Sequence, residues 1–383
     1  MRYVKYISLV LLSLVLLTGC WDKEELENRG FVISMGIDSF DSDSEENKID
    51  TKDKAIRYSL SMTLPNISDL EGQGGEETKS IKKGVGETVS GAMRNIAAHS
   101  SRKIDYGHTK ASIFGEEILS DSDLFKEAID ALERNTELSG KLIILATDER
   151  AEKILMSKVT DDPIIGLFIS NFYKKNSSST AIAFRNDLQR FVQDLRLSGS
   201  AIIPKITLED ENLHLGGAGV IKDFKLVGWL DDDDIKGYLW ANSPMLDEQI
   251  VAQHNDIYVP LRVTKKKDKL SFFYNDGKLY CSYGIYVEGD VEEYKFLEGS
   301  LFNEEMIRSL EMEYKKVVES DLKKTWDAFQ TRYKTDGFSI KDQLKKKNYN
   351  LYKQLEMNWE EEFEKMQLLP NIEVRIKNAG AIK

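Results

Sequence analysis

Apolar and polar residues alternate with a period of two in two stretches near the beginning of the chain, residues 30–37 and 55–64. Phe31, Ile33 and Met35 carry the pattern in the first stretch, and tyrosine and aliphatic residues carry it in the second. Successive side chains of a strand point to opposite faces, so this alternation predicts two strands. We expect these strands to pair antiparallel.

The segment between the two predicted strands, residues 38–54, is acidic and polar. Asp41, Asp43 and Glu45 alternate in it, as carboxylate ligands do in a calcium-binding loop. However, the glycine of an EF-hand is missing, and Lys52 occupies the position of the closing glutamate. A solvated loop is the favoured interpretation.

The pattern then changes to a mixture of helical and strand periods. Apolar residues recur three or four positions apart in residues 89–97, which predicts a helix. Further along the chain we predict a strand at residues 109–114, a helix at 123–135, a strand at 141–147 and a helix at 148–156.

Shorter strands dominate the beginning of the second half. The pattern of residues 213–230 predicts two strands joined by a turn at Lys222 and Asp223. A helix is predicted to follow, because the negative charges of the aspartates 231–234 would stabilise its positive N-terminus. Residues 250–296 are strand-like, but turn-forming clusters interrupt them. We expect the interruptions at residues 265–269, 275–278 and 288–290.

A long helical pattern follows in residues 303–333. Its apolar positions step mainly by three or four: Ile307, Leu310, Tyr314, Val317, Leu322, Trp326 and Phe329. This spacing predicts a helix of about thirty residues with a charged outer face. Gly337 ends the stretch, two further helical segments follow, and the alternating residues 371–380 predict a closing strand that returns to the sheet.

Both halves thus combine helices and strands. The chain is predicted to be a multi-domain α+β protein with mixed or antiparallel sheets, packed helices and a long helix in its C-terminal half. The pattern breaks around residues 198–204. We therefore expect an N-terminal domain at residues 20–205 and a C-terminal region at 206–383, which divides in one interpretation into 206–245 and 246–383.

The first nineteen residues have the features of a secretory signal. Arg2 and Lys5 precede an apolar segment of about twelve residues, which is too short to cross a hydrocarbon core that needs about twenty. The exit at residues 17–20, Leu-Thr-Gly-Cys, resembles the lipobox of bacterial lipoproteins, whose cysteine thiol receives a diacylglyceryl group before cleavage just ahead of it. Cys20 is therefore the predicted lipid attachment site, and residues 1–19 are the predicted signal peptide. An ordinary cleaved signal with an incidental cysteine and an uncleaved anchor helix are the alternatives, and all three place the protein outside the cytoplasm.

Net charge narrows the choice of partners. The chain carries −12, which becomes −14 once Arg2 and Lys5 leave with the signal. Such acidity argues against nucleic-acid binding and would repel an anionic membrane leaflet, so a lipid must hold the chain at a membrane. If Cys20 is acylated, Cys281 has no partner for an intramolecular disulfide, and we expect a buried free thiol there.

Candidate chemistry is sparse. His99, His108, His214 and His254 lie far apart, and none has a second ligand three or four residues away. The glycine cluster at residues 216–219 lacks the rest of a phosphate-binding motif, and a strand-like segment follows it, so close backbone packing is the favoured interpretation. No catalytic constellation, metal site or cofactor site is predicted, and we expect the chain not to be an enzyme.

Lysines cluster at four places, residues 265–267, 315–316, 323–324 and 345–347. Contact with lipid phosphates or with an acidic loop of a partner is one interpretation of these clusters. Solvated faces of turns and helices are the other, and the acids interleaved among the lysines favour it.

Four blocks of the chain resemble the Ger(x)C family, the C subunits of nutrient germinant receptors in endospore-forming bacteria. They are residues 20–38, 100–118, 216–240 and 359–380, in the order of the family. The acidic insertion at residues 41–54 and Asp234, where a glutamate is expected, depart from the family pattern. These departures bear on which receptor the chain would belong to.

The resemblance implies a subunit that its lipid at Cys20 holds on the outer face of the spore's inner membrane. It would work beside an integral A subunit and a transporter-like B subunit, in a receptor that responds to nutrients such as amino acids or sugars. The resemblance also implies several α+β domains of unusual topology. It supplies no catalytic residues.

Two other functions compete with the receptor hypothesis. A solute-binding lipoprotein of an importer should show alternating βαβ units and a crevice between two lobes, whereas this chain shows strand pairs and clustered C-terminal helices. A lipid-anchored envelope hydrolase should show a complete acid, base or metal set. The receptor C subunit is therefore the leading hypothesis.

Overall fold

The strands of the protein form three sheets in the computed structural model, which describes residues 28–41, 55–66, 78–157, 159, 162–175, 183–210, 212–254, 257–293 and 304–378. The predicted signal, Cys20 and most of the acidic segment with its calcium-loop pattern lie outside the described residues. A two-stranded sheet pairs β1 (Arg29–Phe31) with β5 (Lys103–Asp105). The other two sheets have eight and four strands.

The eight-stranded sheet is mixed. Its spatial order is β10 (Lys225–Leu230), β9 (Asn212–Lys222), β8 (Ser200–Glu209), β7 (Ile143–Ala146), β6 (Ala111–Phe114), β2 (Ser34–Ser39), β3 (Tyr58–Pro65) and β4 (Lys79–Gly86). β2 and β3 pair antiparallel, with Ser34 opposite Thr63, which confirms the pairing expected from the sequence. β6 lies parallel to β2, and β7 lies parallel to β6.

One parallel pair, Ala146 with Lys205, links β7 to β8 and so joins the two parts of this sheet. The domain boundary expected after residue 205 falls inside β8, and β9 and β10 complete the sheet on the far side of it. The division of the chain into domains at this point stays a prediction. The predicted turn between β9 and β10 is present, with Asp223 and Phe224 at positive φ.

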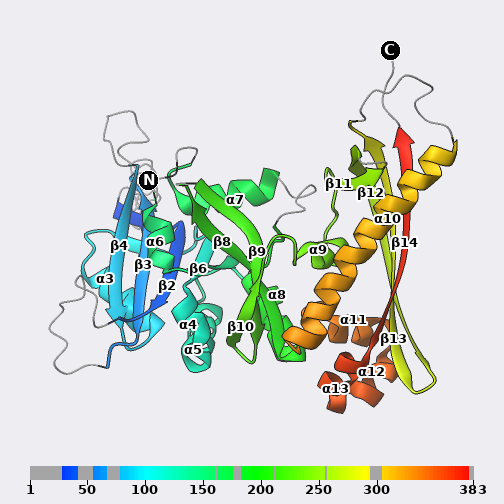
Figure 1. The fold of residues 1–383 in the computed structure, drawn as a ribbon. Coiled ribbons are helices and arrows are strands. Elements are labelled where there is room, and N and C mark those ends of the chain that lie inside the picture. The colour runs from blue at the N-terminus through cyan, green and yellow to red at the C-terminus, as the bar shows by residue number, and fades with distance from the viewer. Residues whose placement is uncertain are drawn as a thin grey trace, which may run out of the picture.

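Helices cover both faces of the eight-stranded sheet (Figure 1). One face carries α3 (Val89–Ala98), α4 (Glu116–Ser120), α5 (Ser122–Arg134) and α8 (Leu188–Ser198). The other carries α6 (Ala151–Met156) and α7 (Ile165–Lys175). Strand alternation separates the two cores, since Ile144 packs in the first core and its neighbours Ile143 and Leu145 pack in the second.

The four-stranded sheet has the order β11 (Gln249–His254), β12 (Ile257–Asn275), β13 (Lys278–Val291) and β14 (Gln367–Asn378). β12 and β13 form a long antiparallel hairpin, and the predicted closing strand β14 returns parallel to β13. The predicted interruption at residues 275–278 is the hairpin turn, with Asp276 and Gly277 at positive φ.

Two other predicted interruptions are wrong, because residues 265–269 and 288–290 lie inside β12 and β13. The charged side chains of these residues find partners within and beside the hairpin, so no turn is needed to expose them to solvent. Lys265 pairs with Glu288 across the strands at 2.7 Å, and Lys266 reaches the carbonyl oxygen of Ser243 at 2.8 Å. A small irregularity between Val263 and Lys265 keeps the strands in register on both sides of it.

The predicted long helix is α10 (Glu304–Asp327), and a π-helical turn, η3 (Ala328–Arg332), continues it. α10 runs along the four-stranded sheet (Figure 1). Its buried stripe steps by four residues through Leu310, Tyr314, Val318, Leu322 and Trp326. This helix, with the mixed and antiparallel sheets, confirms the predicted α+β class.

Residues 333–339, here named the connector, join η3 to three C-terminal helices rather than the two predicted. These are α11 (Ile340–Lys347), α12 (Tyr349–Leu355) and α13 (Trp359–Lys365). Phe338 of the connector is fully buried, and its ring packs 5.4 Å from that of Trp326. Gly337 lies so close to Phe329 that an added Cβ would come within 2.0 Å of the ring, so only glycine fits there.

We predict that Trp326→Ala destabilises the protein by about 3–5 kcal/mol, the usual cost of truncating a large buried aromatic residue. Trp326 is 1% exposed and also packs 5.5 Å from Phe363 of α13. Chemical denaturation followed by tryptophan-independent far-ultraviolet circular dichroism measures the change. Met312→Ala is the matched control on the same helix, because Met312 is 57% exposed and should cost less than about 0.5 kcal/mol. A loss below about 1 kcal/mol for Trp326→Ala would contradict its place in the core.

Candidate functional site

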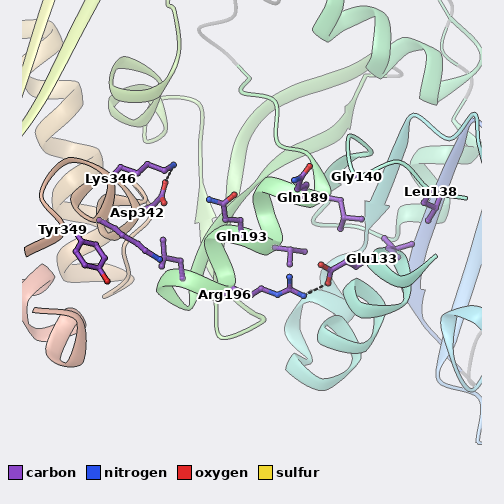
Figure 2. Close-up of a pocket in the computed structure, with 14 residues that line it drawn as sticks. Glu133, Leu138, Gly140, Gln189, Gln193, Arg196, Asp342, Lys346 and Tyr349 are labelled. Atoms are coloured by element: carbon purple, nitrogen blue, oxygen red, sulfur yellow. Dashed lines mark hydrogen bonds and ion pairs between the residues drawn. The ribbon is translucent and has the colours of Figure 1, made fainter. Parts of the chain in front are cut away.

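A groove of about 840 Å³ lies where the helices of the eight-stranded sheet meet the C-terminal helices. α5 and α8 form one wall, and α11 with the first residue of α12 forms the other (Figure 2). Here we call it the junction groove. Its walls come from segments more than 140 residues apart in the chain, and α8 and α11 are in contact beside it.

Local sequence fixes both helices of the first wall. Asp121 caps α5 by accepting the backbone N–H groups of Asp123 and Leu124, each at 3.0 Å. Asp187 caps α8 in the same way through Arg190 N–H at 3.0 Å. The buried residues of α8 recur at helical spacing and hold it on the sheet: Leu188, Phe191, Val192 and Leu195.

The floor of the junction groove is apolar and its rim is polar. Leu132, Leu188 and Val192 are buried at its base. Gln189 and Gln193 project from successive turns of α8 on the rim (Figure 2). These amide side chains supply hydrogen-bond donors and acceptors beside an apolar surface, an arrangement that suits a polypeptide or a small polar ligand.

Each wall of this groove carries one ion pair. Glu133 of α5 accepts a hydrogen bond from Arg196 of α8 at 2.7 Å, and Lys346 pairs with Asp342 within α11 (Figure 2). Tyr349 stands on the opposite rim and is 54% exposed. Exposed tyrosines of this kind are frequent in binding surfaces, because the ring is apolar and the hydroxyl is polar.

A second groove, of about 910 Å³, adjoins the first, and the two share Glu133, Val192 and Arg196. It extends toward α3 and the hairpin between β9 and β10. Arg57 donates to Glu127 at 2.9 Å in it, and Lys126 lies 5.7 Å from the centre of the Phe224 ring.

Two carboxylic acids lie behind the junction groove. Asp336 of the connector is buried and accepts the backbone N–H groups of Ile340 and Lys341, each at 2.8 Å, so it caps α11. Burial raises the pKa of Asp336 to about 6, although these two hydrogen bonds favour its charged form. Burial also raises the pKa of half-buried Asp194 on α8 to about 6, against the opposing effect of Arg190.

The structure separates most of the residues that the sequence singled out. Cys20 lies outside the described residues. Cys281 is a free thiol buried in β13, as predicted, and burial raises its pKa well above the usual range. The histidines lie apart and have separate partners: His99 lies 2.8 Å from the carbonyl oxygen of Asn95, and His214 lies 2.9 Å from Asp232.

The glycine cluster lies inside β9 rather than between a strand and a helix, in agreement with the close-packing interpretation. An added Cβ at Gly216 would come within 2.2 Å of Asp232, and at Gly217 within 2.4 Å of the carbonyl oxygen of Leu230. The unusual Asp234 pairs with Lys324 of α10 at 2.8 Å. This pair helps to fix the segment before α9 (Lys236–Asn242) on the long helix.

The described residues contain no group of three or more histidine, cysteine, aspartate or glutamate side chains placed to hold a metal ion. Within the same part of the chain, no helix is long and apolar enough to cross a membrane. The side chains around the junction groove can form hydrogen bonds, ion pairs and apolar contacts with a ligand. Sequence reasoning missed Glu133, Arg196 and Tyr349, although it noted the neighbouring lysines 345–347.

We predict that Asp336→Asn flattens the dependence of stability on pH between about pH 4 and pH 6. Because burial raises the pKa from 3.8 to about 6, the folded protein binds this proton more tightly than the unfolded chain does. The resulting stabilisation is complete below pH 3.8 and is lost as the pH rises to about 6. Asparagine does not titrate, so the change in unfolding free energy over this range should shrink by about 3 kcal/mol at most.

Urea denaturation at several pH values measures this effect. Asp38 and Asp194, whose pKa values burial also raises to about 6, remain in the variant and keep part of the pH dependence. Asp327→Asn, at the exposed last residue of α10, is the control and should leave the profile of the parent. An unchanged profile for Asp336→Asn would show that this carboxyl is not desolvated.

Comparison with known proteins covers both halves of the chain. Residues 22–208 match the family model described as the spore germination protein N-terminal domain. Residues 216–380 match the model described as spore germination B3/GerAC like, C-terminal. The two models together span nearly the whole described fold.

Individual relatives agree with these models. Spore germination protein B3 of Bacillus subtilis (strain 168) is 20% identical over 391 residues, which cover 100% of each chain. Spore germination protein KC of the same organism is 23% identical over 401 residues, which cover 96% of this chain and 92% of the relative. The crystal structure of the GerBC protein superposes with a TM-score of 0.60 at 17% identity, over 93% of this chain and 100% of that one, and so shares the fold. The chain therefore belongs to the GerAC-like family of spore germination proteins.

Proposed function

We propose that the chain is the lipid-anchored C subunit of a nutrient germinant receptor, and that it acts with membrane-embedded A and B subunits to trigger spore germination. The observation that carries this proposal is the match of both halves of the chain, residues 22–208 and 216–380, to spore germination family models. The names of the relatives, all spore germination proteins, support the same process.

The proposed attachment is a diacylglyceryl group on Cys20, at the outer face of the spore's inner membrane. The Leu-Thr-Gly-Cys sequence at residues 17–20 supports it. Each buried lipid methylene contributes about 0.8 kcal/mol, and two acyl chains suffice for stable attachment where one does not. Anchoring would also raise the local concentration of the chain beside its partners, so that a weak contact becomes effectively intramolecular.

The proposed role is support or coupling within the receptor rather than catalysis. The ion pairs at the rim of the junction groove, such as Glu133 with Arg196, leave their carboxylates already occupied. A groove that has an apolar floor and ion-paired side chains at its rim suits the docking of another polypeptide. Nutrient recognition would then fall to a membrane partner.

We predict that Cys20→Ala leaves the precursor unacylated and weakens germination through this receptor, because the acidic chain would lose its hold on the membrane. Metabolic labelling with a fatty acid, membrane fractionation and nutrient-triggered germination measure the three consequences. Cys281→Ala is the matched control, because Cys281 is buried and its loss should leave labelling intact. Labelling of the Cys20→Ala chain, or parental fractionation and germination, would refute the anchor.

A solute-binding role is the second candidate, and the volume of the junction groove, about 840 Å³, is the observation in its favour. We predict that residues 21–383 do not bind free nutrients by themselves. Calorimetry or ligand-observed NMR against amino acids, sugars and nucleosides should give no saturable signal. One stoichiometric ligand of micromolar affinity would instead favour the solute-binding function.

A further inference from the structure

The two adjoining grooves form one continuous surface along α5 and α8. They share Glu133, Val192 and Arg196, so the Glu133–Arg196 pair lies where one groove passes into the other. We call this surface the α5–α8 strip. Its far rim is built by α11 and Tyr349, so a ligand along the strip would touch both the eight-stranded sheet's helices and the C-terminal helices.

The carboxylates of the strip are already neutralised by neighbours. Each of the four acidic residues that line it has a basic partner within the chain: Glu127 with Arg57, Asp130 with Arg134, Glu133 with Arg196, and Asp342 with Lys346. The hydrogen bonds from Arg57 and Tyr58 lower the pKa of Glu127 below its usual range, with that from Tyr58 the larger effect. The acids of the strip are therefore poorly placed to attract a cationic ligand.

Two cations remain in surplus. Six basic residues line the strip against the four acidic ones, and Lys126 and Lys345 have no carboxylate partner among the described residues. Both side chains are exposed, and each lies over an aromatic ring, Lys126 5.7 Å from the Phe224 centroid and Lys345 5.6 Å from that of Tyr352. A positive strip on a chain of net charge −12 is a local reversal of sign, which favours a ligand of negative charge.

The rest of the strip suits a polypeptide more than a small anion. Exposed Tyr349 and the apolar floor at Val192 offer surface to aliphatic or aromatic side chains. Gln189 and Gln193 offer hydrogen bonds at intervals along α8. An apolar floor between polar rims is the geometry into which an amphipathic segment lays its apolar face.

We propose that the α5–α8 strip is the docking site for an acidic amphipathic segment of a membrane-embedded subunit of the receptor. This inference rests on the proposed function. Acidic residues of the segment would pair with Lys126 and Lys345, and its apolar face would cover the floor and Tyr349. Tyr349 and Lys345 belong to the C-terminal helices, whereas Lys126 belongs to α5. The docked segment would therefore contact both parts at once, and its binding would depend on their relative position.

Photo-crosslinking in intact spores tests the proposal. A photoreactive benzoylphenylalanine replaces Tyr349 in the full-length chain, and in a second strain it replaces Tyr258, which is 70% exposed on the outer face of the four-stranded sheet. Mass spectrometry of the cross-linked peptides identifies the partner segment. We expect the Tyr349 position, and not the Tyr258 position, to cross-link to an acidic, apolar segment of a membrane-embedded protein.

Charge reversal provides the matched comparison. Lys126→Glu with Lys345→Glu should lower the yield at position 349 by about tenfold, since like charges facing each other oppose docking. Lys267→Glu with Lys269→Glu changes the net charge equally at exposed positions of β12, and should leave the yield unchanged. Immunoblots confirm equal amounts of each chain before the yields are compared.

Several outcomes would overturn the docking site. These are cross-links from position 258 but not 349, cross-links at 349 to lipid or to a second copy of this chain, and an equal loss of yield in both charge-reversed strains. Germination of a deletion strain is measured in parallel and tests the proposed function separately. A deletion strain that germinates normally with every nutrient refutes the receptor role, whereas a germination defect without the Tyr349 cross-link refutes only the docking site.

Discussion

Burial of Phe338 is the interaction on which the arrangement of the two large sheets depends. Its ring lies 5.3 Å from Phe329 of η3, 5.4 Å from Trp326 of α10, 6.0 Å from Tyr238 of α9 and 6.2 Å from Tyr283 of β13. The connector that carries it is also tied to the eight-stranded sheet, because Ser200 donates to the carbonyl oxygen of Asp336 at 3.2 Å and Tyr333 donates to that of Trp229 at 2.7 Å. One short segment therefore holds the long helix, the four-stranded sheet and the end of the eight-stranded sheet together.

The junction groove follows from this packing. Asp336 caps α11 from inside the connector, so the position of Phe338 also sets the position of the helix that presents Asp342 and Lys345 opposite α8. The carboxyl groups of Asp336 and Asp194, whose pKa values burial raises to about 6, lie behind the same helix. The wall of the groove thus rests on buried polar groups whose desolvation is costly unless their hydrogen bonds are kept.

Sequence patterns predict the elements whose apolar residues repeat with a clear period. They fail where charged residues, or pairing with a neighbouring strand, decide the local structure. The stripe of α10 and the alternation of β2 and β3 are plain in the sequence, and the structure confirms both. β4 has only one buried residue among many lysines and glycines, so its strand identity depends on pairing with β3. The lysine-rich residues 265–269 suggest a turn, but cross-strand ion pairs such as that of Lys265 with Glu288 stabilise them within β12.

The candidate site is harder to predict from the sequence than the fold, because its residues are distant from one another in the chain. Its residues come from α5, α8 and α11, and Glu133 lies 63 residues before its partner Arg196 in the chain. Helical periodicity assigns the buried face of such helices and leaves the exposed face unspecified. Only the lysines near residue 345 gave a local signal, whereas Cys20, the residue on which the proposed membrane attachment depends, is predicted from the sequence alone.

The central claim of the receptor hypothesis is that the chain assembles with membrane-embedded subunits. The most direct measurement is quantitative mass spectrometry of the proteins that co-purify with the tagged full-length chain from detergent-solubilised spore inner membranes. The hypothesis predicts two membrane-embedded subunits in a defined ratio to this chain. Recovery of the chain alone, or with the membrane domain of an importer, would contradict it.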